Sequence, residues 1–142
     1  MPLWTIYHSA DTFTVGERRE LAEAITDYYA DVVGLPRFYV VVIFRELPTD
    51  DFYVGGRPTG SAARVTIDHI ARRAPDSVTR RRMTTRLSGL LTPLMEKHPE
   101  VHWEFHIDET SEELWMINGL VPPPAGSDAE KAWAAANAAS PY

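Results

Sequence analysis

The chain has 142 residues, of which 44% are hydrophobic and 24% charged, and its formal net charge is −6. These values are typical of one folded domain, and they disfavour both a disordered chain and a general nucleic-acid binder, which needs a net basic surface. Cysteine is absent, which excludes disulfides and thiolate chemistry.

The first predicted elements are a strand and a helix. Leu3–Tyr7 is short and rich in β-forming residues, so it predicts a strand that starts almost at the first residue. Thr14 and Glu17 have the spacing of a capping box, which predicts the start of a helix. The apolar residues that follow recur at spacings of three and four, as one helix face requires: Leu21, Ala24, Ile25, Tyr28, Tyr29 and Val32.

A second strand completes a β-α-β unit within residues 2–60. Gly34 and Pro36 end the helix, and Tyr39–Glu46 then predicts a buried strand, because nearly all of its central residues are apolar β-formers. Phe52–Gly56 ends in two glycines and predicts a short hairpin-like insert before a loop.

Residues 61–110 repeat this plan. Arg64–Ile70 alternates polar and apolar residues, the period of a half-buried strand. Asp76 or Ser77 caps a helix that runs towards Lys97, and Val101–Ile107 alternates again as the last strand.

The two units together predict an α/β (α+β) fold, a duplicated β-α-β arrangement with a four-stranded sheet and two helices on one face. A helical crossover implies parallel strands within each unit. Residues 40–44 are apolar on both sides of their strand, so we expect the uncovered face of the sheet to pack against further copies of the chain. All 142 residues then form one domain.

Residues 111–142 differ in character and predict a C-terminal arm. Pro122–Pro124 favours an extended backbone, and Ser127 with Glu130 predicts the capped start of a short helix. Trp115 and Trp133 are ill suited to a tail in solvent, so we expect this arm to lie on the surface of the domain.

Membrane, metal and cofactor sites are not expected. The longest apolar run, residues 38–44, is too short to cross a bilayer, and no signal-peptide pattern follows Met1, so we expect a cytoplasmic protein. The five histidines, at positions 8, 69, 98, 102 and 106, lack the compact spacing of a zinc site.

Six arginines fall between residues 72 and 86 and raise the possibility of a local anion site, the alternative being a solvated helix face. They are Arg72, Arg73, Arg80, Arg81, Arg82 and Arg86.

A proline directly after Met1, opening a strand in a duplicated β-α-β chain of this size, resembles the tautomerase superfamily. The nearest resemblance is to the branch of cis-3-chloroacrylic acid dehalogenase and to proteins described as "putative oxalocrotonate tautomerases". The residues that carry it are Pro2, Ala24–Asp27, Val40–Phe44 with Glu46, Phe52–Gly56, Arg72, Trp103, Asp108–Thr110, and Trp115–Pro124.

The resemblance implies a cofactor-free enzyme that loses Met1 and uses the freed amine of Pro2 as general acid and base. Its substrate would be a small carboxylate, a 2-oxo acid or its enol, and its assembly a homotrimer. Arg72 occupies the position of a substrate-binding arginine. A second arginine of that branch falls on Pro75, so Arg73 would have to replace it.

Other family positions differ. Tyr29 stands where the dehalogenase has a histidine, and it could equally be a core tyrosine. Phe105 stands where a tyrosine is expected, and Met116 where a water-activating glutamate belongs. Glu112 or Glu113 could replace that glutamate only in a shifted loop.

Three more residues are candidates for substrate contact. His69 lies on the third predicted strand, and Asp68 beside it points to the other face, so the two form no dyad. Trp115 could provide an apolar wall and Asn118 an amide donor. A structural or surface role for His69, and a covering role for the arm, remain as alternatives.

Three functions are therefore open. A tautomerase needs a Pro2 amine that is neutral near pH 7, whereas a dehalogenase-like hydratase needs one that stays protonated as a general acid. The replaced family residues also allow a binding protein of the same fold without catalytic activity.

Overall fold

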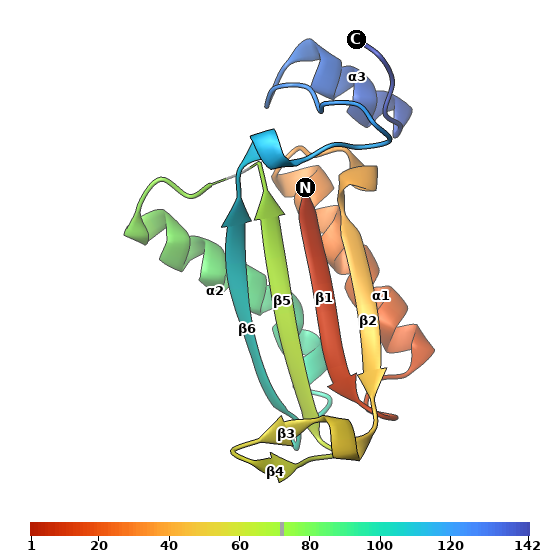
Figure 1. Ribbon diagram of the computed structural model, residues 1–142, viewed down its shortest axis with the longest axis vertical. Coiled ribbons are helices and arrows are strands. Elements are labelled where there is room, and N and C mark those ends of the chain that lie inside the picture. Colours follow the sequence, from red (N-terminus) through yellow and green to blue (C-terminus); the bar gives the residue numbers. More distant parts are fainter. Residues whose placement is uncertain (72) are drawn as a thin grey trace.

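The computed structural model describes residues 1–71 and 73–142. Its centre is a four-stranded sheet in the order β2-β1-β5-β6, with two long helices packed on one face (Figure 1). The first unit comprises β1 (Pro2–Ser9), α1 (Val15–Asp27) and β2 (Val41–Leu47), and the second comprises β5 (Ala62–Ile70), α2 (Ser77–Met95) and β6 (His102–Thr110).

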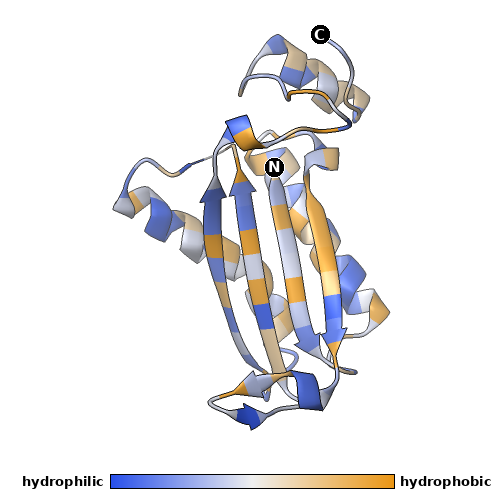
Figure 2. Ribbon diagram, viewed as in Figure 1, coloured by the Kyte–Doolittle hydropathy of each residue, from blue (hydrophilic) through white to orange (hydrophobic). Residues whose placement is uncertain are grey.

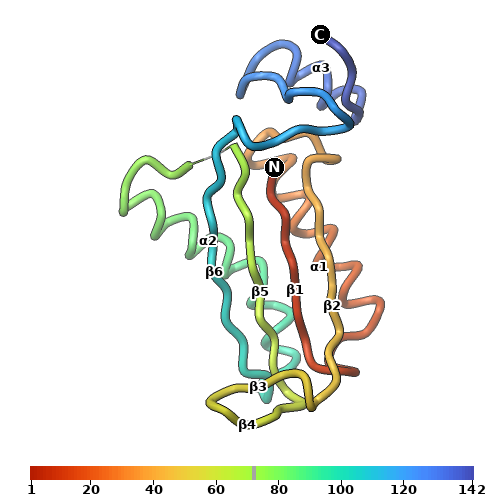
Figure 3. Tube along the Cα trace, viewed as in Figure 1, coloured from red at the N-terminus to blue at the C-terminus, as the bar shows by residue number. Residues whose placement is uncertain are grey.

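Strand pairing confirms the predicted duplication. β1 pairs in parallel with β2, and β5 pairs in parallel with β6, while the two units meet through the antiparallel pair β1–β5. In the tube view each helix crosses behind its own pair of strands (Figure 3). The α+β class and the four-stranded sheet are those expected from the sequence.

The alternation of side chains along β1 places the core between the sheet and the helices. Pro2, Trp4, Ile6 and His8 are all buried on the helix-facing side. The residues between them point to the open face of the sheet and are more exposed. Figure 2 shows bands of alternating hydropathy along β5, whose buried and half-buried residues alternate in the same way. Pro2 and Trp4 therefore lie on the same side of β1, the side that faces the helices.

The second strand differs from its prediction. It begins at Val41, because Tyr39 belongs to a 3₁₀ turn at Arg37–Tyr39, and none of its residues is fully buried. Within residues 1–71 and 73–142, β2 is an edge strand that pairs with β1 alone, so Val41 remains 38% exposed. The expectation of a buried strand was wrong for the single chain.

The first helix also ends differently from the prediction. After α1 the chain continues as a π-helical turn, Tyr28–Val32, instead of as regular α-helix. Such turns are rare and often occur at functional sites.

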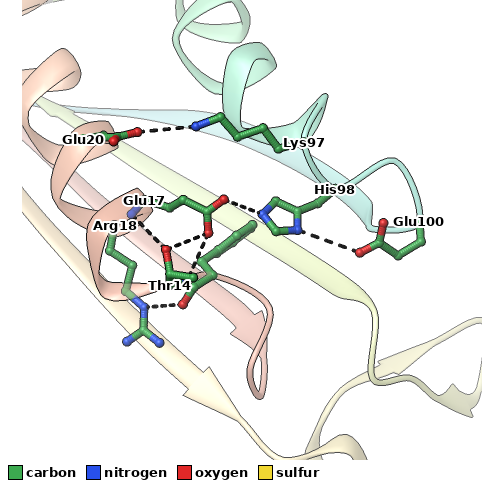
Figure 4. A network of polar contacts seen from close by, with 8 residues as sticks. Thr14, Glu17, Arg18, Glu20, Lys97, His98 and Glu100 are labelled. Carbon is green, nitrogen blue, oxygen red and sulfur yellow. Dashed lines mark hydrogen bonds and ion pairs between the residues drawn. The ribbon is translucent and has the colours of Figure 1, made fainter.

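The helices are joined at the end of the sheet away from the N-terminus. The predicted capping box is present: Thr14 and Glu17 each bond the other's backbone N–H. The other carboxylate oxygen of Glu17 lies 2.9 Å from His98 Nε2, in the segment after α2, and Lys97 lies 3.4 Å from Glu20 (Figure 4). These contacts join the start of α1 to the end of α2.

The glycine-rich insert is the expected hairpin. β3 (Tyr53–Val54) and β4 (Arg57–Pro58) pair in an antiparallel manner. Gly55 and Gly56 between them have φ of 59° and 79°, values that favour glycine in a tight two-residue turn.

The C-terminal segment lies over the end of the sheet that bears the N-terminus (Figure 1). Its helix α3 (Asp128–Ala136) is capped by Ser127, and Trp133 is 1% exposed. The ring of Trp115 lies 5.0 Å from that of Tyr39. In the part of the chain that the structure describes, no helix has the length and apolar character needed to cross a membrane.

Candidate active site

A cavity of about 200 Å³ opens at the N-terminal end of β1, between the sheet and the helices. Pro2 and His69 line it from the sheet, Tyr29 from the π-helical turn, and Arg73 from the loop before α2. The remaining wall is mostly apolar and includes Leu35, Met83 and Leu87. Four residues that the sequence singled out therefore meet in one cavity.

The strand register makes Pro2 and His69 close neighbours. They are directly opposite on β1 and β5. Met1 and Ile70, the adjacent pair, exchange two backbone hydrogen bonds of 2.6 and 2.8 Å. Because such pairs alternate in an antiparallel ladder, Pro2 and His69 form the non-hydrogen-bonded pair, in which side chains approach most closely. Proline, which has no backbone N–H, suits this position.

Tyr29 reaches the same place from the π-helical turn. Its hydroxyl lies 2.6 Å from His69 Nε2 and accepts a hydrogen bond from the Trp4 indole N–H at 3.3 Å. All three side chains are buried. Tyr29 is thus both a core tyrosine and part of the cavity wall, so the two roles considered from the sequence are compatible.

Burial keeps these groups neutral. It lowers the pKa of His69 to about 4, and the positive charge of the N-terminal amine acts in the same direction. Burial also raises the pKa of the Tyr29 hydroxyl. At neutral pH the cavity therefore presents an uncharged imidazole and an uncharged phenol.

Arg73 is the described cationic side chain at this cavity, and it is exposed at the rim. Ala71, two residues earlier, has φ of 72°, a left-handed conformation that alanine rarely adopts. Arg72, predicted as the main substrate-binding arginine, lies outside the described residues. Among the residues 1–71 and 73–142, no group of histidine, aspartate and glutamate is arranged to hold a metal ion.

Phe105, Trp115 and Asn118 are not brought to this cavity. Phe105 lies on β6 and pairs with Val65 of β5. This level of the sheet is four residues, or about 13 Å, along the strand from His69. Phe105 lines a different cavity. Trp115 packs on Tyr39 and borders a much smaller cavity. Asn118 is exposed in a tight turn, with φ of 51°. Their predicted substrate contacts stay predictions.

The two acidic candidates, Glu112 and Glu113, also do not line the Pro2 cavity. Glu112 borders the small cavity that also contains Met1 and Trp115, next to the N-terminus. Glu113 is exposed in the short turn Glu112–Leu114.

Trp4 and the π-helical turn are features of the site that the sequence did not predict. Trp4 could have been found, because it is two residues from Pro2 on the same strand and so shares its face. The turn could not, since Tyr28–Val32 continues the apolar spacing of the preceding helix.

Comparison with known proteins identifies relatives along the whole chain. Residues 1–138 match the family model described as "putative oxalocrotonate tautomerase enzyme". RhCC from Rhodococcus jostii RHA1 is 44% identical, with 99% of both chains covered and a TM-score of 0.92. A probable enzyme from the thermophilic fungus Aspergillus fumigatus is 39% identical, with 100% of this chain and 98% of that chain covered and a TM-score of 0.92.

A more distant structure shares the fold. N1, a member of the cis-3-chloroacrylic acid dehalogenase family, is 21% identical, with 92% of this chain and 89% of that chain covered and a TM-score of 0.72. None of the curated proteins compared with the chain matches it.

Proposed function

The chain belongs to the family of "putative oxalocrotonate tautomerase" enzymes, in the tautomerase superfamily, and from this premise we propose that it is a cofactor-free tautomerase. It moves a proton on a small 2-oxo acid or its enol, with the amine of Pro2 as general acid and base. The observation that carries this proposal is that Pro2 is fully buried at the edge of a mostly apolar cavity that also holds His69 and Tyr29.

The proposed reaction requires the loss of Met1. As long as Met1 is present, the Pro2 nitrogen is an amide and cannot bind a proton. Removal of Met1 converts it into a rigid secondary amine, and an apolar cavity disfavours its charged form. The same removal breaks the two hydrogen bonds between Met1 and Ile70, which leaves the Ile70 N–H at the cavity as a further donor.

The amine then acts as a proton carrier. In the keto-to-enol direction it takes a proton from the carbon beside the carbonyl and returns it to the oxygen. Arg73 at the rim would pair with the substrate carboxylate, a role for which the planar guanidinium is suited. Arg72 is proposed as a second carboxylate contact from its family position alone.

Intact mass and kinetics test the proposal. We expect a mass without Met1, and ketonisation of phenylenolpyruvate that falls by about 10³-fold in Pro2→Ala. Pro58→Ala, on the exposed strand β4, is the matched control and should keep the wild-type rate. Retained Met1 in an active enzyme, or equal rates for wild type and Pro2→Ala, would remove Pro2 from the mechanism. A folded chain with no turnover of any 2-oxo acid would favour the non-catalytic binding protein.

Hydration in the manner of a dehalogenase is the second candidate, and the position of Glu112 favours it. Glu112 and Met1 line the same small cavity, and on this basis its carboxylate is the candidate for the group that activates water. In that reaction Pro2 stays protonated as general acid. An NMR titration of ¹⁵N-labelled Pro2 distinguishes the two, because the tautomerase requires a pKa below neutral and the hydratase one well above it.

The assembly is proposed to be a homotrimer. The open face of the sheet carries Leu3, Val41 and Ile43 on the paired strands β1 and β2, all at least partly exposed in the single chain. Burial of such a face between copies would be favourable. Light scattering should give about three times the 16.0 kDa chain mass, and a monomer would contradict the proposal.

A further inference from the structure

Three buried side chains from three separate elements form one line of hydrogen bonds that ends at the Pro2 cavity. Trp4 lies on β1, Tyr29 on the π-helical turn, and His69 on β5. The Trp4 Nε1–Tyr29 oxygen distance is 3.3 Å, and the Tyr29 oxygen–His69 Nε2 distance is 2.6 Å.

The chemistry of the three groups gives this line a direction. An indole N–H can only donate, so Tyr29 accepts from Trp4. The Tyr29 hydroxyl then donates its one hydrogen to His69 Nε2. In the reverse arrangement the phenol would accept twice and its own proton would be buried without an acceptor, which is costly. Nε2 is therefore the unprotonated nitrogen, and the imidazole hydrogen is on Nδ1.

The Nδ1–H is the part of His69 left for a ligand. Among the described side chains, none bonds Nδ1, while His69 lines the cavity directly opposite Pro2. The low pKa of His69, about 4, means that the ring is neutral at physiological pH. A neutral imidazole can still polarise a carbonyl by hydrogen bonding, and it does so without a charge that would compete for the proton.

We propose that Trp4 and Tyr29 fix His69 as a neutral Nδ1–H donor to the substrate oxygen that becomes an enolate during the reaction. The inference rests on the proposed tautomerase function and adds to it the group that stabilises the oxyanion. Pro2 takes the proton from carbon, the C–H electron pair becomes the C=C bond, and the carbonyl π pair moves to oxygen. His69 donates a hydrogen bond to that oxygen and transfers no proton, and the proton held by Pro2 then neutralises the oxygen to give the enol.

In this scheme His69 contacts the reacting atoms, whereas Tyr29 and Trp4 are positioning residues. A donor whose bond strengthens as the oxygen becomes charged accelerates the chemical step more than it improves substrate binding. The kinetic effect of losing it should therefore appear in kcat.

The first test reads the hydrogen position directly. Side-chain ¹⁵N NMR at pH 7.5, with His69 assigned by its loss in His69→Gln, should show a protonated Nδ1 and an unprotonated Nε2. Tyr29→Phe should turn this single tautomer into a mixture. An Nε2–H tautomer or an imidazolium in the wild type would overturn the proposal, and this readout does not depend on activity.

The second test uses a pair of amides that place their N–H differently. His69→Asn puts an amide near the Nδ1 position, and His69→Gln puts it near Nε2. In ketonisation of phenylenolpyruvate, we expect His69→Gln to lower kcat by about 100-fold with KM nearly unchanged. His69→Asn should recover about tenfold of that loss, and Tyr29→Phe should cost about tenfold.

The control is His8→Gln, which changes a buried histidine on the same face at the far end of β1 and should keep the wild-type kcat. A His69→Gln enzyme with wild-type kcat, while Pro2→Ala is inactive, would overturn the role of His69 and leave the proposed function standing. Full activity in Pro2→Ala with loss in His69→Gln would overturn the proposed role of Pro2 and leave the role of His69 as a hydrogen-bond donor standing.

Discussion

The two ends of the sheet each carry a buried histidine on the helix-facing side of the sheet, yet they are built differently. His69 bonds Tyr29 and borders a cavity, beside a π-helical turn and a left-handed Ala71. His8, at the other end, bonds the carbonyl of Ser9 and packs on aromatic rings. The centroids of the His8 and Phe13 rings are 5.1 Å apart.

The difference separates stability from ligand binding. At the His8 end a capping box starts α1, and the Glu17–His98 hydrogen bond and the Glu20–Lys97 ion pair join α1 to the segment after α2 (Figure 4). Irregular backbone at the His69 end leaves space and orients polar groups towards it, which is typical of functional sites. Changes at the His8 end should therefore affect the unfolding free energy alone, and changes at the His69 end should also affect enzyme kinetics.

The largest expected effect on stability comes from two leucines of α2 with no measurable exposure. Leu87→Ala and Leu91→Ala should each lower the unfolding free energy by about 2–5 kcal/mol, because each leaves a void in a packed core. Leu87 borders the cavity, so only its variant should also raise KM for phenylenolpyruvate. Urea denaturation and steady-state kinetics measure both. Equal KM values for the two variants would break the proposed separation.

Acid should destabilise the protein through both histidines. His69 has a pKa of about 4 when folded and about 6.5 when unfolded, so between these values the unfolded chain binds the extra proton. The contribution of neutral His69 to the unfolding free energy is therefore fully present above about pH 6.5. It is lost as the pH falls towards 4, by up to about 3 kcal/mol. Burial lowers the pKa of His8 in the same direction.

Urea denaturation at pH 7 and pH 4.5 checks this, with His69→Asn and His8→Asn as matched variants. Each should be less stable than wild type at pH 7, and each should lose less stability on acidification. An unchanged pH dependence in both would contradict the assignment of these two histidines as buried and neutral.

At the His8 end, Glu17→Ala removes the capping box and the bond to His98, and we expect a loss of about 1–2 kcal/mol without a change in kcat. Hydrogen bonds to the Thr14 backbone and to His98 hold the pKa of Glu17 at about 2. Its contribution should therefore be present above about pH 4.3 and decrease as the pH falls towards 2. Glu23→Ala, at an exposed position of the same helix, is the control; a similar loss there would point to helix propensity instead.

The smallest effect is expected from Lys97→Ala. Its pair with Glu20, at 3.4 Å, is exposed on both sides, with side-chain exposures of 55% and 72%. Such pairs contribute less than about 1 kcal/mol, so the unfolding free energy should change by no more than about 0.5 kcal/mol. A larger loss would mean that this pair, and not Glu17, joins the two helices.

The sequence determined the features that depend on neighbours along the chain. The capping box at Thr14, the two-glycine hairpin at Gly55–Gly56 and the alternation along β5 each occur as predicted, because each is set within about eight residues. Pro2 and Tyr29 were recognised as candidates through the family resemblance. These local patterns were sufficient for the α+β class and the duplicated units.

Only the tertiary structure decided what surrounds Pro2. The bonds that build the site join Trp4 to Tyr29, Tyr29 to His69, and Met1 to Ile70, across 25, 40 and 69 residues. No local pattern encodes such partners, because strand register and the packing of a π-helical turn select them after the units assemble. For the same reason, the sequence grouped Phe105 and Asn118 with Pro2, whereas the register and a surface turn place them elsewhere.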